Sequence, residues 1–269
     1  MKTRFTRKSV CSMLILMIAF SMLLSAFAFG AAAKRKKIKT IKEYDANGVL
    51  TYSTSRTYDS KGNVKVASNY HLVDGQGINE KSTAKLTYWK GTSILKKSVE
   101  IWPGFTYTTE YTKKGAPKKA VSLNEYGSYT TTYKSSGKYP KSSVTVDETG
   151  RKISEVIYDN RGGMKTQISY SSDGSKQKTT YNTKYYKTGY VQKLTTINPD
   201  GSTRVSTRNK QGDLLKSVYK DPSGKVTTYT YKNKYNKAGY MVDSKGYADG
   251  KLVSHTVYTY TSKAYPVDF

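Results

Sequence analysis

The feature that most constrains this chain is the regular spacing of its glycines. From position 48 onward a glycine recurs at short and nearly even intervals, and the segments between are rich in Thr, Tyr, Val, Lys and Ser. The regularly spaced glycines are Gly48, Gly62, Gly75, Gly91, Gly104, Gly115, Gly127, Gly137, Gly150, Gly162, Gly174, Gly189, Gly201, Gly212, Gly224, Gly239 and Gly250. Turn residues at this spacing are typical of short antiparallel strands. The sequence therefore predicts up to about eighteen strands, each about eight residues long.

The segments between the glycines alternate in the way that a half-buried strand requires. Tyr129, Thr131 and Tyr133 would share one face, with Thr130 and Thr132 on the other. Tyrosine and threonine are both favoured on pleated surfaces, where side chains alternate with a period of two. No segment has the length and the periodicity of a substantial helix. We predict an all-β fold.

The turn residues favour hairpins between consecutive strands. Asn47-Gly48, Asp173-Gly174 and Asp200-Gly201 are pairs that accept the positive φ angles of tight hairpin turns. Strands that are neighbours in the sequence can then pair without long connections. The simplest architecture is an antiparallel β-meander, forming an open or spiralling sheet.

A longer repeat, with a period of about 50 residues, contains the short one. A shift of this size places Tyr185 on Tyr235 and Gly189 on Gly239. Each unit would hold about four strands, which is also the content of a β-propeller blade. A propeller of four or five blades is therefore the alternative to the open sheet.

Three turns share the pattern Y-D-x-x-G, at Tyr44–Gly48, Tyr58–Gly62 and Tyr158–Gly162. This pattern resembles the YD-repeat, or RHS-repeat, class of bacterial secreted and surface proteins. The resemblance implies successive hairpins that form long, curving sheets, an extracellular location, and a binding or scaffold role. The chain is much shorter than the large members and has no counterpart of their effector domain. The Asp of each motif would accept hydrogen bonds from turn amides.

The N-terminal segment, positions 1–33, has the layout of a secretory signal peptide, in which four basic residues precede an apolar stretch and small-residue cleavage motifs. An uncleaved membrane anchor is the alternative, because the stretch from Val10 to Ala33 is uncharged and long enough to span a bilayer. The rest divides into a basic N-terminal tail (34–43), a β-repeat domain (44–262) and a C-terminal tail (263–269). The only cysteine, Cys11, lies in the signal segment, so the chain after it forms no disulfide.

Charge and composition set limits on the core and on the partners. Four of the 46 basic residues and none of the 19 acidic ones lie in the first 33 positions, which leaves a net charge of +23. Such a charge attracts polyanions. Leu, Ile, Val and Phe are scarce after position 33, whereas all 26 tyrosines lie there. Tyrosine buries a large area and keeps a polar tip, so we expect a folded domain with a thin core.

The sequence contains no recognisable catalytic or metal-binding pattern. His71 and His255 are the only histidines, which leaves no histidine cluster for a metal. His255 lies in an alternating segment and is interpreted as an ordinary strand residue. We therefore predict a protein that is not an enzyme and binds no cofactor or small-molecule substrate.

The predicted function is binding or scaffolding outside the cell. The chain would be secreted, associate with the cell envelope and bind an anionic wall or extracellular polymer, contacting it through Lys34, Arg35, Lys36 and Lys37. The alternative is a carbohydrate-binding module in which Trp89 and Trp102 stack on a glycan. The membrane would be a partner only if the N-terminal segment were not cleaved.

Overall fold

The described part of the chain forms a single antiparallel sheet of 18 strands that closes on itself. The structure, a computed structural model, describes residues 35–73 and 75–265. The strands are β1 (Arg35–Tyr44), β2 (Leu50–Tyr58), β3 (Val64–Val73), β4 (Gln76–Tyr88), β5 (Leu95–Trp102), β6 (Phe105–Tyr111), β7 (Pro117–Asn124), β8 (Gly127–Ser136), β9 (Tyr139–Asp147), β10 (Lys152–Tyr158), β11 (Met164–Tyr170), β12 (Lys176–Tyr185), β13 (Val191–Ile197), β14 (Thr203–Arg208), β15 (Leu214–Lys220), β16 (Val226–Tyr235), β17 (Met241–Ala248) and β18 (Lys251–Tyr265).

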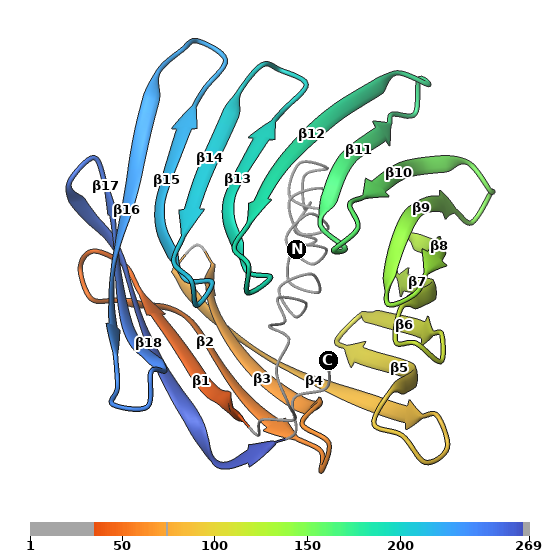
Figure 1. Ribbon diagram of the computed structural model, residues 1–269, viewed down its shortest axis with the longest axis horizontal. Helices are drawn as coiled ribbons and strands as arrows, with labels where there is room; N and C mark the ends of the chain where they lie inside the picture. The colour runs from red at the N-terminus through yellow and green to blue at the C-terminus, as the bar shows by residue number, and fades with distance from the viewer. Residues whose placement is uncertain (1–34, 74, 266–269) are drawn as a thin grey trace.

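The closure depends on pairing between the first strand and the last. Consecutive strands pair throughout, and β1 also pairs with β18, with Arg35 opposite Tyr265 and Thr40 opposite Thr259. The hydroxyl oxygens of Thr40 and Thr259 are 2.7 Å apart. Figure 1 shows β1 (orange-red) beside β18 (dark blue), with the other strands wrapped around the same axis. The sheet is therefore a barrel without free edges.

This closure corrects the predicted architecture. The strands, their number and their sequential antiparallel pairing are as expected. The open or spiralling sheet expected from the YD-repeat resemblance is wrong, because β1 pairs with β18 and β9 pairs with β10 in one continuous ring. The four- or five-bladed propeller is wrong for the same reason, since its blades would be separate sheets.

The predicted domain limits are also adjusted. Residues 35–43 of the expected basic tail belong to β1, and β18 continues to Tyr265, beyond the expected limit at position 262. The signal peptide predicted for residues 1–33 lies outside the described ranges. Within those ranges, no helix has the length and apolar character needed to cross a membrane.

The Y-D-x-x-G motif forms the turns as predicted. In the β2–β3 turn, Oδ1 of Asp59 accepts hydrogen bonds from the backbone N–H groups of Lys61 and Asn63, both at 2.9 Å. The Gly62 N–H donates to the Asp59 carbonyl at 3.2 Å. Gly62 has φ = 85°, a conformation that favours glycine. The aspartate therefore fixes the turn through its side chain and its backbone together.

The second carboxylate oxygen of the turn aspartate, Oδ2, accepts a hydrogen bond from a tyrosine. This tyrosine lies at the end of the strand that comes after the following turn. The Tyr185 hydroxyl on β12 donates to Oδ2 of Asp159, in the β10–β11 turn, at 2.6 Å. Tyr88 makes the same bond to Asp59. In the β14–β15 turn Asn209 takes the place of the aspartate, and the Tyr235 hydroxyl donates to Oδ2 of Asp213 at 2.9 Å. These bonds join hairpins that are adjacent at one end of the barrel.

A second contact at this end explains why glycine ends the motif. A Cβ atom at Gly162 would lie 2.8 Å from Cδ1 of Tyr139, and one at Gly212 would lie 2.9 Å from Cδ1 of Tyr190. Each tyrosine follows the preceding turn at the same end of the barrel. The glycine therefore gives both the turn conformation and the space into which the neighbouring hairpin packs.

We expect Asp159→Ala to reduce the free energy of unfolding by about 2 kcal/mol, because it removes hydrogen bonds from two turn amides and from Tyr185. Asp173→Ala is the control, because Oδ1 of Asp173 accepts from the Ser175 amide in a turn without the tyrosine bond. Urea denaturation of both variants measures the difference. An equal loss in the two would contradict the proposed linkage between hairpins.

Candidate functional site: a lysine-rich outer face

The strand pairing sorts the side chains onto two faces. Residues directly opposite one another across a pair of strands project to the same side of a sheet. Among the described strands, the buried side chains all lie on one face, and they are Thr54, Ala67, Asn69, Ser82, Ser98, Thr109, Ala120, Ser143, Val156 and Ser217. Several are direct partners, such as Thr54 with Asn69 and Ser143 with Val156. This is the inner face, because the curvature of a barrel crowds side chains toward its axis.

The inner face is rich in tyrosine. On β6, β8 and β10 it carries Tyr107, Tyr111, Tyr133 and Tyr158, and burial raises the pKa of each above its usual value. Burial also raises the pKa of Glu100 on β5, the direct partner of Tyr107. The thin core expected from the composition is therefore a layer of tyrosine, serine and threonine along the inside of the barrel.

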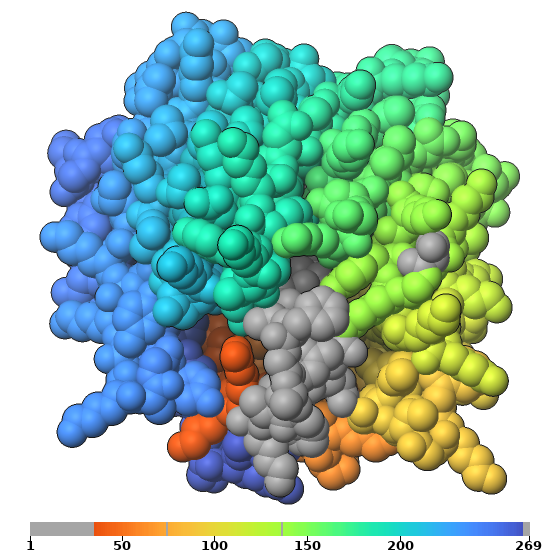
Figure 2. Space-filling view, viewed as in Figure 1, coloured from red at the N-terminus to blue at the C-terminus, as the bar shows by residue number. Residues whose placement is uncertain are grey.

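The outer face carries the lysines. In β12–β17 the strand sequences contain nine lysines and one acidic residue, Asp243. The register places all nine on the outer face: Lys176, Lys178, Lys184, Lys193, Lys216, Lys220, Lys232, Lys234 and Lys245. We call this set the lysine face. The strands that carry it form the teal-to-blue part of the surface in Figure 2.

Two pairs of lysines in this set lie directly opposite each other. Lys184 faces Lys193 across β12 and β13, and Lys232 faces Lys245 across β16 and β17. The first row continues through Thr207 to Lys216. Like charges in direct cross-strand positions are destabilising. The lysine face therefore concentrates positive charge at a cost to the sheet itself.

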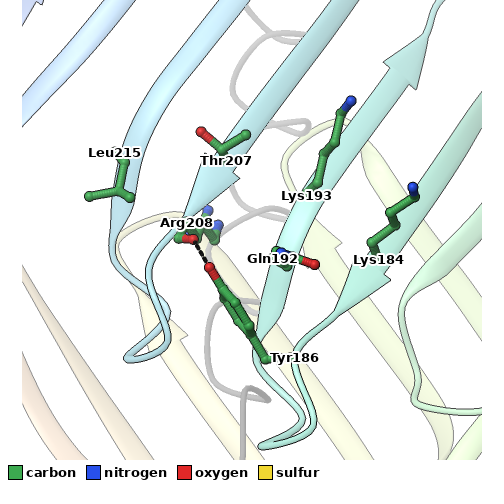
Figure 3. A pocket seen from close by; sticks show the side chains of 7 residues that line it. All are labelled: Lys184, Tyr186, Gln192, Lys193, Thr207, Arg208 and Leu215. Carbon is green, nitrogen blue, oxygen red and sulfur yellow. Dashed lines mark hydrogen bonds between the residues drawn. The ribbon is translucent and has the colours of Figure 1, made fainter.

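A hollow of about 370 Å³ lies within the lysine face. It is lined by Lys184, Lys193, Thr207, Arg208, Tyr186, Gln192 and Leu215 (Figure 3). Gln192 and Leu215 are bulge residues, skipped where the β12–β13 and β14–β15 registers shift. The Tyr186 hydroxyl donates to the Arg208 carbonyl at 2.7 Å, which ties the β12–β13 turn to β14. Burial lowers the pKa of Arg208.

The predicted basic contact residues do not form a free tail. Arg35 and Lys36 pair with Tyr265 and Ala264 where the barrel closes, and the Lys36 N–H donates to the Tyr240 hydroxyl at 3.2 Å. The Lys37 N–H donates to the Thr261 hydroxyl at 3.1 Å. Lys34 lies outside the described ranges. The tail prediction failed because the partner strand, β18, comes from the opposite end of the sequence.

The two tryptophans are not brought together. Trp89 lies in the β4–β5 turn, and Trp102 ends β5 and pairs with Phe105. They are therefore at opposite ends of β5, about 25 Å apart for an eight-residue strand. Trp89 also donates its Nε1–H to the Thr112 carbonyl at 3.2 Å, in the next turn at that end. A joint stacking platform of Trp89 and Trp102 is therefore wrong.

The structure reveals an acid–histidine contact that the sequence did not indicate. His255 Nε2 lies 2.5 Å from Oδ2 of Asp243, and the Tyr44 ring centroid is 5.9 Å from the imidazole centroid. The contact crosses the β17–β18 hairpin and depends on a register shift within it. Across residues 35–73 and 75–265, no three His, Cys, Asp or Glu side chains form a group that could hold a metal.

Comparison with known proteins does not assign the chain to a family. No protein-family model matches the chain, and no curated protein matches it. A porin-like protein from Bacteroides uniformis has a TM-score of 0.48 and 10% identity, covering 83% of this chain and 96% of its own. A porin-like protein from Bacteroides vulgatus has a TM-score of 0.24 and 10% identity, covering 84% and 99%. Neither of these two is described as a YD-repeat or RHS-repeat protein, so the comparisons do not support the resemblance to that class.

The inner tyrosines generate a prediction about alkaline stability. Burial raises the pKa of Tyr258 and of Tyr260 to about 12, whereas an unfolded tyrosine ionises near pH ~10. The raised folded pKa means that their contribution to stability is complete below pH ~10 and is lost as the pH rises toward 12. In the Tyr258→Phe variant, we expect the free energy of unfolding to decrease less steeply as the pH rises through this window. Denaturant titrations at several pH values measure the slope, and an unchanged slope would contradict the assignment.

Proposed function

We propose that the protein is a non-enzymatic β-barrel of the cell envelope whose lysine face binds an anionic polymer. The observation that carries this proposal is the sorting of charge in β12–β17, where nine lysines share the outer face with one aspartate. Exposed lysines at this density attract a polyanion and release its counterions on binding.

The barrel closure removes one alternative role for these lysines. Lysine on an exposed sheet edge protects it from pairing with another chain. The closed ring of strands has no such edge, because β1 and β18 pair with each other. The strands of the lysine face are instead paired on both sides, and direct pairs such as Lys184 and Lys193 repel each other. A bound polyanion would offset this repulsion.

The hollow beside Lys184 and Lys193 supports a defined contact in this face. Its lining combines ammonium groups with Gln192, Thr207 and Tyr186, which offer amide and hydroxyl groups. Lys216 continues the same row one strand beyond Thr207. A polymer that crosses the strands here would meet Lys184, Lys193 and Lys216 in succession.

The test is a triple variant of that row, Lys184→Gln, Lys193→Gln and Lys216→Gln. We expect its retention on an immobilised polyphosphodiester to fall on the order of ten-fold at low salt, and the slope of log affinity against log salt to decrease by about two to three. Retention of the full mature chain on purified cell envelopes, eluted with a salt gradient, is the parallel measurement.

A matched control removes the same charge elsewhere on the outer face. Lys85, Lys97 and Lys119 lie on β4, β5 and β7, and Glu110 lies between Lys97 and Lys119 as their direct partner. We expect Lys85→Gln, Lys97→Gln and Lys119→Gln to change retention much less. Equal effects of the two triple variants would show that only the net charge matters. Retention insensitive to salt would overturn the proposal.

A further inference from the structure

A second hollow on the outer face has a different chemistry. It measures about 200 Å³ and lies over β1–β4. Two rows of outer residues form it. The first runs Lys42, Ser53, Tyr70, Asn79 and the second runs Thr40, Ser55, Ser68, Lys81, each residue being the direct partner of the next. All of these except Lys81 line the hollow, and the lining contains no aspartate or glutamate.

The Tyr70 ring lies against the sheet because of a glycine on the next strand. A Cβ atom at Gly77 would lie 2.7 Å from Cε2 of Tyr70 and 3.1 Å from its hydroxyl oxygen. The Cε2–hydroxyl edge of the ring therefore occupies the space beside Gly77 that a side chain would fill, and any other residue would displace it. This contact fixes the position of the ring beside the hollow that Tyr70 lines. A ring held in this way is a preformed stacking surface.

Small polar groups lie between two lysines, of which Lys42 lines the hollow and Lys81 lies beside it. Ser53, Ser55 and Ser68 supply hydroxyl groups that donate and accept, and Asn79 supplies an amide. Lys42 on β1 and Lys81 on β4 flank these groups at diagonally opposite corners. With strands about 4.8 Å apart and alternate residues about 6.7 Å apart, the corners are about 16 Å from each other. This length accommodates about three sugar rings in a row.

We propose that this hollow is a subsite for an anionic saccharide, in which Tyr70 stacks on a sugar ring. Ser53, Ser68 and Asn79 bind sugar hydroxyls, while Lys42 and Lys81 bind the acidic substituents of neighbouring units. The inference rests on the proposed polyanion binding and specifies the class of polymer. It also assigns the aromatic contact to Tyr70 on the lysine-flanked outer face, in place of the two separated tryptophans.

The experiment measures binding of the mature chain to three probes by titration calorimetry: a tetramer of galacturonate, a polyphosphate of the same charge, and a single-stranded oligothymidylate. We expect Tyr70→Ala to weaken galacturonate binding on the order of ten-fold and to leave polyphosphate binding unchanged. Tyr70→Phe is expected to retain galacturonate binding, because it keeps the ring.

Gly77→Ala is a second variant, which keeps the Tyr70 side chain but displaces its ring. Gly77 does not have a positive φ, and the three atoms nearest to an added Cβ all belong to Tyr70, so alanine displaces the ring without straining the backbone. We expect the same loss of galacturonate binding as in Tyr70→Ala. The control is Tyr170→Ala, which removes an outer tyrosine on β11, with thermal unfolding of every variant confirming the fold.

The outcomes separate this inference from the function on which it rests. If the wild type binds neither galacturonate nor polyphosphate, the polyanion proposal fails. If both bind and Tyr70→Ala or Gly77→Ala has no selective effect, the polymer binds by charge alone and the saccharide subsite is wrong. If oligothymidylate binds more tightly than galacturonate and depends on Tyr70, the ring stacks on bases, which also overturns the saccharide assignment.

Discussion

The pairing of β1 with β18 is the interaction on which the rest of the structure depends. A chain with so few Leu, Ile, Val and Phe residues cannot bury one face of a flat sheet against a second layer. Closing the ring gives every strand two neighbours and turns one face toward the axis, where tyrosine, serine and threonine crowd together. Hydrogen bonds between strands thus contribute much of the stabilisation that a hydrophobic core provides in other folds.

The closure also determines what the protein offers to a partner. Because side chains alternate along every strand, fixing the inner face fixes the outer one. In β12–β17 this assigns Arg204 to the inner face, opposite Tyr219, and the lysines to the outer one. The same rule brings Lys42, Tyr70 and Asn79 into one row on β1–β4. Neither surface is visible in a linear sequence, although each follows from the register.

The sequence predicted local structure well and failed at long range. The glycines give the turns, and the longer repeat matches Tyr185 with Tyr235, which both donate their hydroxyl groups to aspartates at the same end of the barrel. The seam was unpredictable because Arg35 and Tyr265, at opposite ends of the chain, carry no mutual signal. The Trp89–Trp102 platform failed because an entire strand separates them. The Asp243–His255 contact depends on a register shift that no residue pattern reveals.

The distribution of charge shows that stability alone does not account for the outer face. Lys97 and Lys119 have Glu110 between them, which is a favourable arrangement for exposed strands. Lys184 and Lys193, or Lys232 and Lys245, face each other directly with no carboxylate in the pair. The outer face of this barrel therefore contains lysines that are paired with a carboxylate and lysines that face another lysine. The repulsive arrangement makes physical sense where an external anion completes it, and this favours a binding surface on β12–β17 rather than one spread evenly around the barrel.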